Sequence, residues 1–381
     1  MTAEDGSTTR ARPRLHVAML APANAIHTKR WVRALAGRGH RITLISQHPD
    51  AASYEGLPVV IDDLHHRGMA GYFLNALYVR RRLAVLKPDL LNVHYASGYG
   101  TTAALSGFRP ALLSVWGSDV YDFPYEARWK ARLLRYNLRR ATRIASTSVV
   151  MSEQVERLVP DLPPPFITPF GVDLERFKPQ PERDPQLITI GTVKTLAPKY
   201  GIDVLIRAFA LLLGDDGIGR DLKARLRLVI VGGGEQMGEL QALAKDLRLG
   251  ERAVFVGPVP HEQVPTWLNR LDVYVAASRL DSESFGVAVI EASACGLPVV
   301  VTDVGGLPEV VEDETTGIIV PKESPTAIAE AIKRLLIDPE RRQKMGEAGR
   351  QHVVAKYGWE HCIDVMEDAF YATSAHAGVK R

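Results

Sequence analysis

The 381-residue sequence predicts an α/β protein built from two doubly wound domains. Short runs of β-branched and aliphatic residues alternate with longer helical segments along the whole chain. The strand runs are continuously apolar, which is typical of parallel strands covered by helices on both faces. Five strands with helices between them fall in each half, which is enough for one doubly wound sheet per half.

In the first half, strands and helices are expected in regular order. The expected strands are the apolar runs Leu15–Leu20, Arg41–Ser46, Asp89–His94, Ala111–Val115 and Arg143–Ser146. The expected helices are Thr28–Arg38, Gly71–Leu86, Glu126–Arg140 and Met151–Leu158. The N-terminal residues 1–13 are polar and lack the apolar core of a secretory signal, so we predict a disordered tail.

The second half repeats the alternation. The expected strands are Leu187–Ile190, Leu226–Val231, Ala253–Val256, Val273–Ala276 and Pro298–Val301. The expected helices are Ile202–Leu212, Gly234–Leu247, Gln263–Asn269, Val287–Ala294, Pro325–Leu336 and Pro339–Lys356. Between the halves, the proline-rich stretch Pro160–Pro181 predicts a linker. The predicted domains are therefore residues 14–170 and 171–356, with a ligand site in the cleft between them.

The net charge of +3 divides unequally along the chain. Residues 1–170 hold 22 Lys and Arg against 13 Asp and Glu, whereas residues 171–381 hold 25 against 31. Such asymmetry predicts two bodies with different partners. The hydrophobic fraction of 46% excludes disordered and fibrous proteins.

The cysteine content and the hydropathy pattern indicate a cytoplasmic protein. Cys295 and Cys362 are the two cysteines, and neither lies in a CxxC pair. A disulfide framework and a Cys-rich zinc site are thus disfavoured, which fits a reducing compartment. No apolar run approaches the ~18–20 residues needed to cross a bilayer.

The segment from Asp281 to Ala292 carries the strongest functional signal. Glu283 and Glu291 stand eight residues apart, and Ser284, Phe285 and Gly286 lie between a loop and a helix start. The free N–H groups of a helix that begins there suit a phosphate, and the two carboxylates could bind hydroxyls beside it. Spacing alone equally allows an N-terminal capping acid and a solvated helix glutamate.

Lysines in another strand-to-helix loop could bind a diphosphate. Lys194 and Lys199 lie between Gly191 and Gly201, although two surface lysines would give the same pattern. The glycine-rich turn Gly232–Gly238 follows a strand but has Met237 where a dinucleotide-binding fingerprint needs its third glycine. No phosphate-binding P-loop motif occurs, so NAD binding is disfavoured.

In the first half, polar residues follow three strands at the edge where parallel strands end together. They are Asn24, His27, Lys29, His94, Trp116, Gly117, Ser118 and Asp119. His94 by itself is more often a hydrogen-bonded structural histidine than a base, and Asp119 could be a turn cap. No HExxH or DxD motif appears, so nothing in the sequence requires a metal.

A stripe of arginines is expected on the helix that begins at Glu126. Its members fall within an arc of about 80° at helical spacing, and they are Arg128, Arg132, Arg135, Arg139 and Arg143. Trp129 and Tyr136 flank the stripe, so this face could lie on anionic lipid, and a solvated helix face is the alternative. Nucleic acid is the weaker partner because no recognition motif accompanies the charge.

Together these segments resemble the family-4 retaining glycosyltransferases, which have the two-domain GT-B fold. Glu283 and Glu291, with the internal Ser-Phe-Gly, are similar to the Glu-x7-Glu signature of that family. Further blocks match in order along the chain, and they are Gly171–Pro179, Gly232–Glu235, Phe255–Gly257, Val304–Glu309 and Gly317–Val320. The resemblance extends from Arg14 to about residue 370.

The resemblance implies sugar transfer from a nucleotide-diphosphate donor of UDP or GDP type, with retention and without an obligatory metal or other cofactor. Glu283 would contact the donor sugar and Glu291 the ribose. The implied donor-binding residues are Lys194, Lys199, Ser284, Phe285, Gly286, Val287, Glu291, Gly257 and Pro258. Residues 357–381 would contain a helix that crosses back to the first domain, followed by a tail.

The chain departs from the family pattern in its first half. The family usually has a histidine at the strand end occupied here by Trp116, whose indole N–H can only donate. We hypothesise that His27 or His94 supplies the missing imidazole and that Asp119 orients the sugar or acceptor. Asn24, Trp116 and Gly117 are assigned to the acceptor side.

The predicted acceptor is a lipid-linked or surface glycan, handled by a cytoplasmic enzyme or by one bound peripherally to the inner face of the cell membrane. Two alternatives stay open at this point. A nucleotide-sugar 2-epimerase shares the GT-B architecture but would leave the arginine stripe unexplained. A non-catalytic GT-B partner subunit would tolerate Trp116 but would have no need of Glu283 and Lys194.

Overall fold

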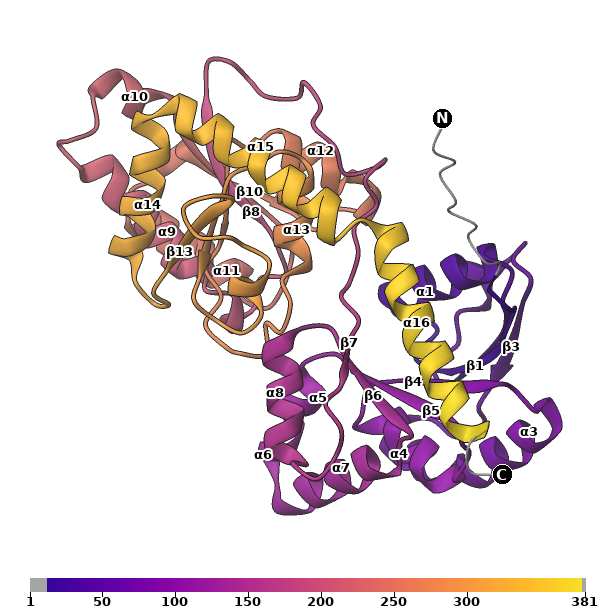
Figure 1. Cartoon of the computed structure of the whole chain (residues 1–381). Coiled ribbons are helices and arrows are strands. Elements are labelled where there is room, and N and C mark those ends of the chain that lie inside the picture. The colour runs from indigo at the N-terminus through magenta and orange to yellow at the C-terminus, as the bar shows by residue number, and fades with distance from the viewer. Residues whose placement is uncertain (1–11, 379–381) are drawn as a thin grey trace, which may run out of the picture. The chain divides into compact units, whose positions relative to one another are not determined.

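The computed structural model describes residues 12–378, with side chains through residue 375, so residues 1–11 of the predicted tail lie outside its range. The chain forms two compact units (Figure 1). The first unit comprises residues up to Val115, Phe123–Ala145 and the residues from Glu367, and the second comprises Trp116–Asp122 and Ser146–Met366. The predicted contiguous ranges 14–170 and 171–356 therefore differ from the observed units at residues 116–122 and 146–170.

The first sheet contains seven strands within the described residues, in the order β3-β2-β1-β4-β5-β6-β7. They are β1 His16–Leu20, β2 Arg41–Ser46, β3 Val59–Asp63, β4 Leu90–His94, β5 Ala111–Val115, β6 Arg143–Ser146 and β7 Phe166–Ile167. The pairings from β3 through β5 are parallel. The strand order reverses between β1 and β4, which makes that point the topological switch of the sheet.

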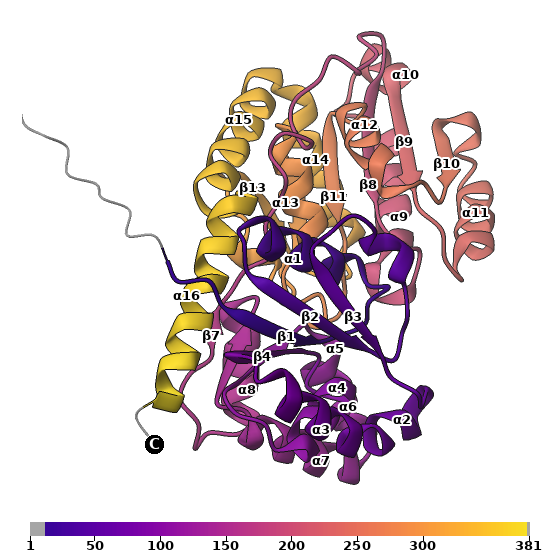
Figure 2. The same ribbon diagram turned by 90° about the vertical axis from the view of Figure 1, so that its right-hand side faces the viewer.

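The helices of the first half are α1 Ile26–Gly37, α2 Gly68–Leu74, α3 Ala76–Leu86, α4 Gly98–Ser106, α5 Ser118–Tyr121, α6 Phe123–Glu126, α7 Arg128–Arg140 and α8 Val149–Leu158. The single helix expected over 71–86 is split, because the buried Asn75 exchanges side-chain hydrogen bonds with the backbone of His66. The helix expected over Glu126–Arg140 begins at Arg128 as α7, and the short α6 that precedes it ends at Glu126. Four of these helices lie on one side of the first sheet (Figure 2). Among them, α4 contacts both α2 and α7, and α7 also contacts α6.

The second sheet contains six strands within the described residues, in the order β10-β9-β8-β11-β12-β13. They are β8 Ile188–Val193, β9 Leu226–Val231, β10 Ala253–Gly257, β11 Val273–Ala276, β12 Val299–Thr302 and β13 Gly317–Val320. All of its pairings are parallel. This order matches that of the first six strands of the first sheet, and its switch point lies between β8 and β11.

Helices alternate with these strands as expected. They are α9 Ile202–Gly214, α10 Arg220–Arg225, α11 Met237–Asp246, α12 Val264–Asn269, α13 Val287–Ala294, α14 Pro325–Ile337, α15 Pro339–Lys356 and α16 Trp359–Gly378. Short 3-10 turns are η1 Ala51–Tyr54, η2 Pro198–Tyr200, η3 Gly250–Arg252, η4 His261–Gln263 and η5 Leu307–Glu309. Sequence reasoning missed α4, α5, α10 and the strands β3, β7 and β13.

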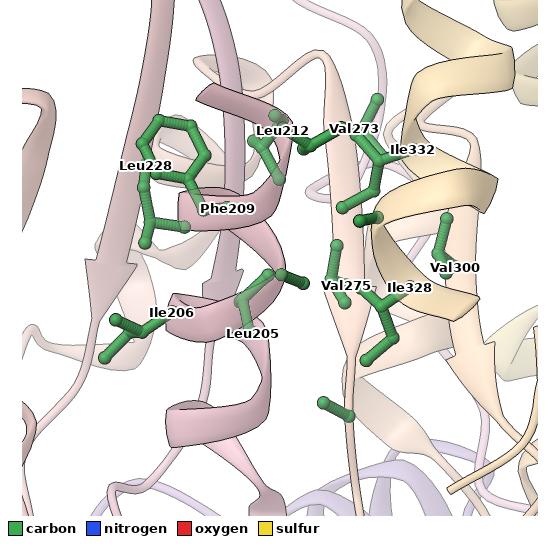
Figure 3. Close-up of a cluster of buried hydrophobic side chains, with 14 of the residues drawn as sticks. Leu205, Ile206, Phe209, Leu212, Leu228, Val273, Val275, Val300, Ile328 and Ile332 are labelled. Carbon is green, nitrogen blue, oxygen red and sulfur yellow. The ribbon is translucent and has the colours of Figure 1, made fainter. Parts of the chain in front are cut away.

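One face of the second sheet is covered by α9 and α14, whose apolar side chains interlock with the strands. Figure 3 shows Leu205 and Phe209 of α9, four residues apart, on one side of Val275 of β11, and Ile328 and Ile332 of α14 on its other side. All five side chains are at most 1% exposed. The i, i+4 spacing of these residues is what the helical pattern predicts.

The other face of this sheet packs against α13 and a row of aromatic rings. The ring of Phe285 lies edge-on to Phe170 at 5.8 Å and to Tyr357 at 5.7 Å between centroids. The ring of Trp116 continues this row, with its centroid 5.5 Å from that of Phe170. These contacts anchor the segment that precedes α13.

The two ends of the described range are joined by contacts within the first unit. Arg12 pairs with Asp368 at 2.9 Å, and the hydroxyl of Tyr371 donates to the carbonyl of Pro13 at 2.8 Å. The structure thus differs from the predicted tail at residues 12 and 13. The helix α16 begins in the second unit and continues into the first from Glu367.

Candidate functional site

The start of α13 lies at the switch point of the second sheet. The loop after β11 ends at Gly286, which is the N-cap residue of α13 and has no side chain to cap the helix. The first backbone N–H groups of a helix have no acceptor within it, and they carry the positive end of the helix dipole. This arrangement can bind an anion, as the sequence predicts for residues 285–287.

Glu283 is held beside this helix start by an ion pair with Lys194. The lysine Nζ donates to Glu283 Oε1 at 2.9 Å, and the two side chains are 19% and 10% exposed. Lys194 comes from the loop after β8, so the pair joins the two loops that flank the switch point. The sequence predicted both residues as ligand contacts but gave no sign that they contact each other.

The groups around Lys194 keep its ammonium group protonated. Burial alone would lower the pKa of its ammonium group, but the Glu283 carboxylate, with smaller contributions from Tyr274 and Tyr200, raises the pKa above its ordinary value. The ammonium also lies 4.4 Å from the centre of the Tyr200 ring, and Lys199 lies 4.8 Å from the same ring. Because an ammonium has three donors, its bond to Glu283 leaves capacity for a phosphate oxygen.

Two glycine-containing turns pack closely against the backbone of these two loops. A Cβ on Gly232 would fall 1.8 Å from the carbonyl oxygen of Lys194, and one on Gly305 would fall 2.3 Å from that of Glu283. Both glycines also have positive φ angles, of 142° and 53°. A side chain at either position would push the loops apart, which explains why the sequence carries glycine there.

Glu291 lies on the same helix, buried in its second turn. His261 Nε2 lies 3.3 Å from Glu291 Oε1, and the imidazole packs edge-on against Phe177 at 5.9 Å. Sequence reasoning missed His261, because no spacing rule connects it to a helix thirty residues later. Gly257 and Pro258 lie beside the glycine-rich turn, where Gly257 accepts a bond from the N–H of Gly232 at 2.9 Å.

Trp116, Gly117 and Asp119 lie in the second unit with this site. Asp119 Oδ1 accepts bonds from the N–H groups of Trp116 at 3.1 Å and Gly117 at 2.9 Å, which is the geometry of a turn cap. The hydroxyl of Ser284 donates to the carbonyl of Trp116 at 3.3 Å. The structure therefore brings the predicted acceptor-side turn into contact with the predicted donor-binding segment.

His94 lies in the first unit and is enclosed. Its Nε2 lies 2.9 Å from Asn92 Oδ1 and its Nδ1 lies 3.3 Å from Thr28 Oγ1, and the residue is 1% exposed. Burial, with a smaller contribution from His27, lowers the pKa of His94 to about 3. These contacts favour a neutral structural histidine over a general base. His27 is half-buried in the first turn of α1. Asn24 is exposed on the loop between β1 and α1.

The arginine stripe occupies the solvent side of α7. Arg128, Arg132, Arg135 and Arg139 are exposed, whereas Leu134 and Leu138 are buried. Arg143 belongs to β6 and is half-buried, so it is not part of the helix. Among residues 12–378, no helix is long and apolar enough to cross a membrane. No cluster of three potential metal ligands occurs in that range either.

The sequence matches two family models that together span most of the chain. Residues 173–352 match the model described as glycosyl transferases group 1. Residues 16–148 match the model described as glycosyl transferase 4-like. The matched regions correspond to the second and the first sheet, respectively.

Among curated relatives, the GDP-mannose-dependent alpha-(1-6)-phosphatidylinositol monomannoside mannosyltransferase of Mycolicibacterium smegmatis is 36% identical over 208 residues. That alignment covers 50% of this chain and 52% of the relative. D-inositol 3-phosphate glycosyltransferase 1 of Catenulispora acidiphila is 35% identical over 227 residues, covering 55% and 51%. The chain thus spans about half the length of the curated relatives it matches.

A solved structure has the same fold over nearly the whole chain. Sucrose-phosphate synthase from Thermosynechococcus elongatus superposes with a TM-score of 0.77 at 21% identity, covering 95% of this chain and all of that one. At this level of identity the likeness concerns the fold. The predicted GT-B fold is confirmed.

The burial of His94 predicts a stability that depends on pH. Its pKa of about 3 in the folded chain lies below its ordinary value of 6.5, so below pH 6.5 the unfolded chain takes up a proton that the folded chain excludes. The stabilisation is complete above pH 6.5 and is lost as the pH falls toward 3, by up to about 1.4 kcal/mol per pH unit.

Urea unfolding of the wild type and of His94→Gln, from about pH 7 to about pH 5, measures this effect. The free-energy gap between the two proteins should narrow as the pH falls, because only the wild type carries the titrating imidazole. A gap that stays constant over this range would contradict the account of His94.

Proposed function

Because the chain belongs to the GT-B glycosyltransferases, we propose that it transfers a sugar from a nucleotide-diphosphate donor to a hydroxyl of a lipid-linked or surface-glycan acceptor, with retention of configuration. The observation that carries the proposal is the Lys194–Glu283 pair beside the start of α13. It places a cation, a carboxylate and helix N–H groups at one switch point. These groups suit a ligand in which a diphosphate adjoins a polyhydroxylated sugar.

In this proposal each group has one task. The N–H groups at the start of α13, together with Lys194 and Lys199, bind the diphosphate. Glu283 accepts hydrogen bonds from the donor sugar and Glu291 accepts them from the ribose. The backbone at Gly257 and Pro258 contacts the base, and Ser284 and Phe285 shape the entrance to the helix.

The transfer step breaks the bond between the sugar C1 and the diphosphate oxygen and forms one between C1 and the acceptor oxygen. The acceptor proton passes to the departing phosphate oxygen. The negative charge that develops on the diphosphate is stabilised by the helix N–H groups and the lysines, which are already oriented before reaction. In this proposal those groups carry out the charge stabilisation that a metal would otherwise supply.

The relatives suggest which substrates to test first. One is named for GDP-mannose and a phosphatidylinositol mannoside, and another for inositol 3-phosphate. Both acceptor names contain a phosphoinositol group. We therefore propose GDP-mannose as the first donor to test and a phosphoinositol-bearing molecule as the first acceptor.

Replacing Glu283 tests the assignment of the site. Glu283→Gln keeps the shape of the side chain but removes its charge, so transfer should fall by at least about 100-fold. Release of nucleotide from a panel that includes GDP-mannose and UDP-glucose, with and without membrane lipid extract, measures turnover. The matched control is Glu262→Gln, because Glu262 is exposed on η4.

Near-normal turnover by Glu283→Gln would rule out the role assigned to that residue. Rearrangement of the donor sugar without any acceptor would instead indicate the 2-epimerase. Absence of turnover by the wild type with every donor, in the presence of acceptor, would favour a non-catalytic partner subunit.

We also propose that the arginine stripe of α7 contacts the anionic inner face of the cell membrane. Each arginine near an anionic surface contributes about 1 kcal/mol. The triple variant Arg132→Ser, Arg135→Ser, Arg139→Ser should therefore bind vesicles containing phosphatidylglycerol roughly 100-fold more weakly at low salt. Sedimentation with vesicles across a salt series measures this.

A control triple variant removes three exposed cations from the second unit, namely Arg207→Ser, Arg220→Ser and Lys245→Ser. It should bind vesicles as the wild type does. Equal losses in the two variants would show a general charge effect, and unchanged binding of the α7 variant would reject this helix as the contact.

A further inference from the structure

The first unit contains a cavity of about 510 Å³ that the proposed donor site does not use. It opens at the switch point of the first sheet, since Pro22 follows β1, and Tyr95 and Ser97 follow β4. Parallel α/β sheets bind their ligands at this place. The volume is in the range of cavities that enclose a small organic ligand.

The wall of the cavity is aromatic and tightly held. The rings of Tyr72 and Tyr99 meet edge-on at 5.3 Å, and Tyr99 Oη lies 2.7 Å from His48 Nδ1 and 3.1 Å from Ser46 Oγ. The Tyr99 hydroxyl is thus already hydrogen-bonded on the side of β2. A Cβ on Gly98 would lie 2.4 Å from the Tyr72 ring, so the glycine allows the ring to approach the backbone this closely.

Large apolar side chains stay exposed at the rim of this cavity. Met69 is 61% exposed, Phe73 46% and Trp129 52%, and all three line the cavity. They come from α2 and α7, which both pack against α4 (Figure 2). An exposed apolar patch that continues into a cavity marks a binding surface for an apolar ligand.

The charged groups near the cavity are arranged in two ways. Inside it, Lys130 pairs with Glu126 and lies 5.2 Å from the centre of the Phe123 ring. At its edge, Trp129 is flanked on α7 by the exposed Arg128 and Arg132. The interior cation is thus matched by a carboxylate, and the net positive charge lies outside, beside the apolar rim.

We propose that this cavity binds a fatty acyl chain of a phospholipid acceptor, with the lipid phosphate at the arginines of α7. A sugar would need convergent polar groups, whereas the Tyr99 hydroxyl is already bonded to His48 and Ser46 and the Lys130 ammonium to Glu126. An acyl chain matches the aromatic wall, and an anionic headgroup matches the arginine edge. The inference rests on the proposed function and narrows its acceptor from any surface glycan to a lipid-anchored one.

Calorimetric titration with palmitoyl lysophosphatidylinositol, below its micelle concentration, tests the proposal against the soluble headgroup glycerophosphoinositol. The wild type should bind the lipid at least about 100-fold more tightly than the headgroup. The double variant Phe73→Ser, Trp129→Ser should lose most of that preference. The variant with leucine at both positions should retain it, because the apolar rim is preserved.

The control is Leu211→Ser, Val254→Ser, which removes two exposed apolar side chains from the second unit and should bind the lipid as the wild type does. Thermal melting checks that all variants fold. Equal affinity for lipid and headgroup would overturn the proposal, as would unaltered binding by the serine variant. Tight binding of farnesyl phosphate without binding of the acyl lipid would overturn it too.

The transfer assay separates this proposal from the proposed function. If no donor is turned over but lipid binding follows the expected pattern of variants, the transferase proposal fails and the acyl site stands. If transfer proceeds equally well to the headgroup and to the lipid, and the serine variant binds normally, the acyl site fails and the transferase proposal stands.

Discussion

The second unit is organised around one buried ion pair, between Lys194 and Glu283. Each charge comes from a different loop, and the loops follow the two strands between which the sheet order reverses. Removing two charges from water is costly, and the cost is offset only when each finds its partner with good geometry. The pair therefore sets the distance between the two loops. The close approach of Gly232 to the Lys194 carbonyl, and of Gly305 to the Glu283 carbonyl, sets how tightly each loop packs against the neighbouring turn. The start of α13 is held in place as a result.

The same pair has a chemical consequence. A carboxylate that already accepts a bond from a lysine keeps its other oxygen for hydroxyl groups, and a lysine whose pKa is raised stays charged beside a phosphate. The two sheets share one strand order over their first six strands, so each presents a switch point. One switch point carries charge and helix N–H groups. The other carries aromatic rings with arginines at the edge.

Much of this could be predicted from the sequence, and the remainder depends on contacts between distant segments. Continuous apolar runs predicted most strands, and the segment from Glu283 to Glu291 predicted the helix start at Gly286 where the candidate site lies. The apolar runs of β3 and β13, at residues 59–61 and 318–320, are only three residues long, which is shorter than the runs of about four to eight residues that indicate a strand. The break between α2 and α3 depends on hydrogen bonds of Asn75 to a residue nine positions earlier. The Asp119 turn cap is local and could be anticipated, whereas the contact of His261 with Glu291 and the cavity of the first unit depend on segments far apart in the sequence.

If a nucleotide-diphosphate sugar binds at the start of α13, the first backbone amides of that helix donate hydrogen bonds to its diphosphate. Hydrogen exchange of the backbone amides of Val287 and Ala288, with and without a donor that the protein turns over, measures this. Both amides should become protected when the donor binds, together with the loop that carries Lys194. Turnover of a donor while both amides exchange as fast as in the free protein would contradict binding at this helix start.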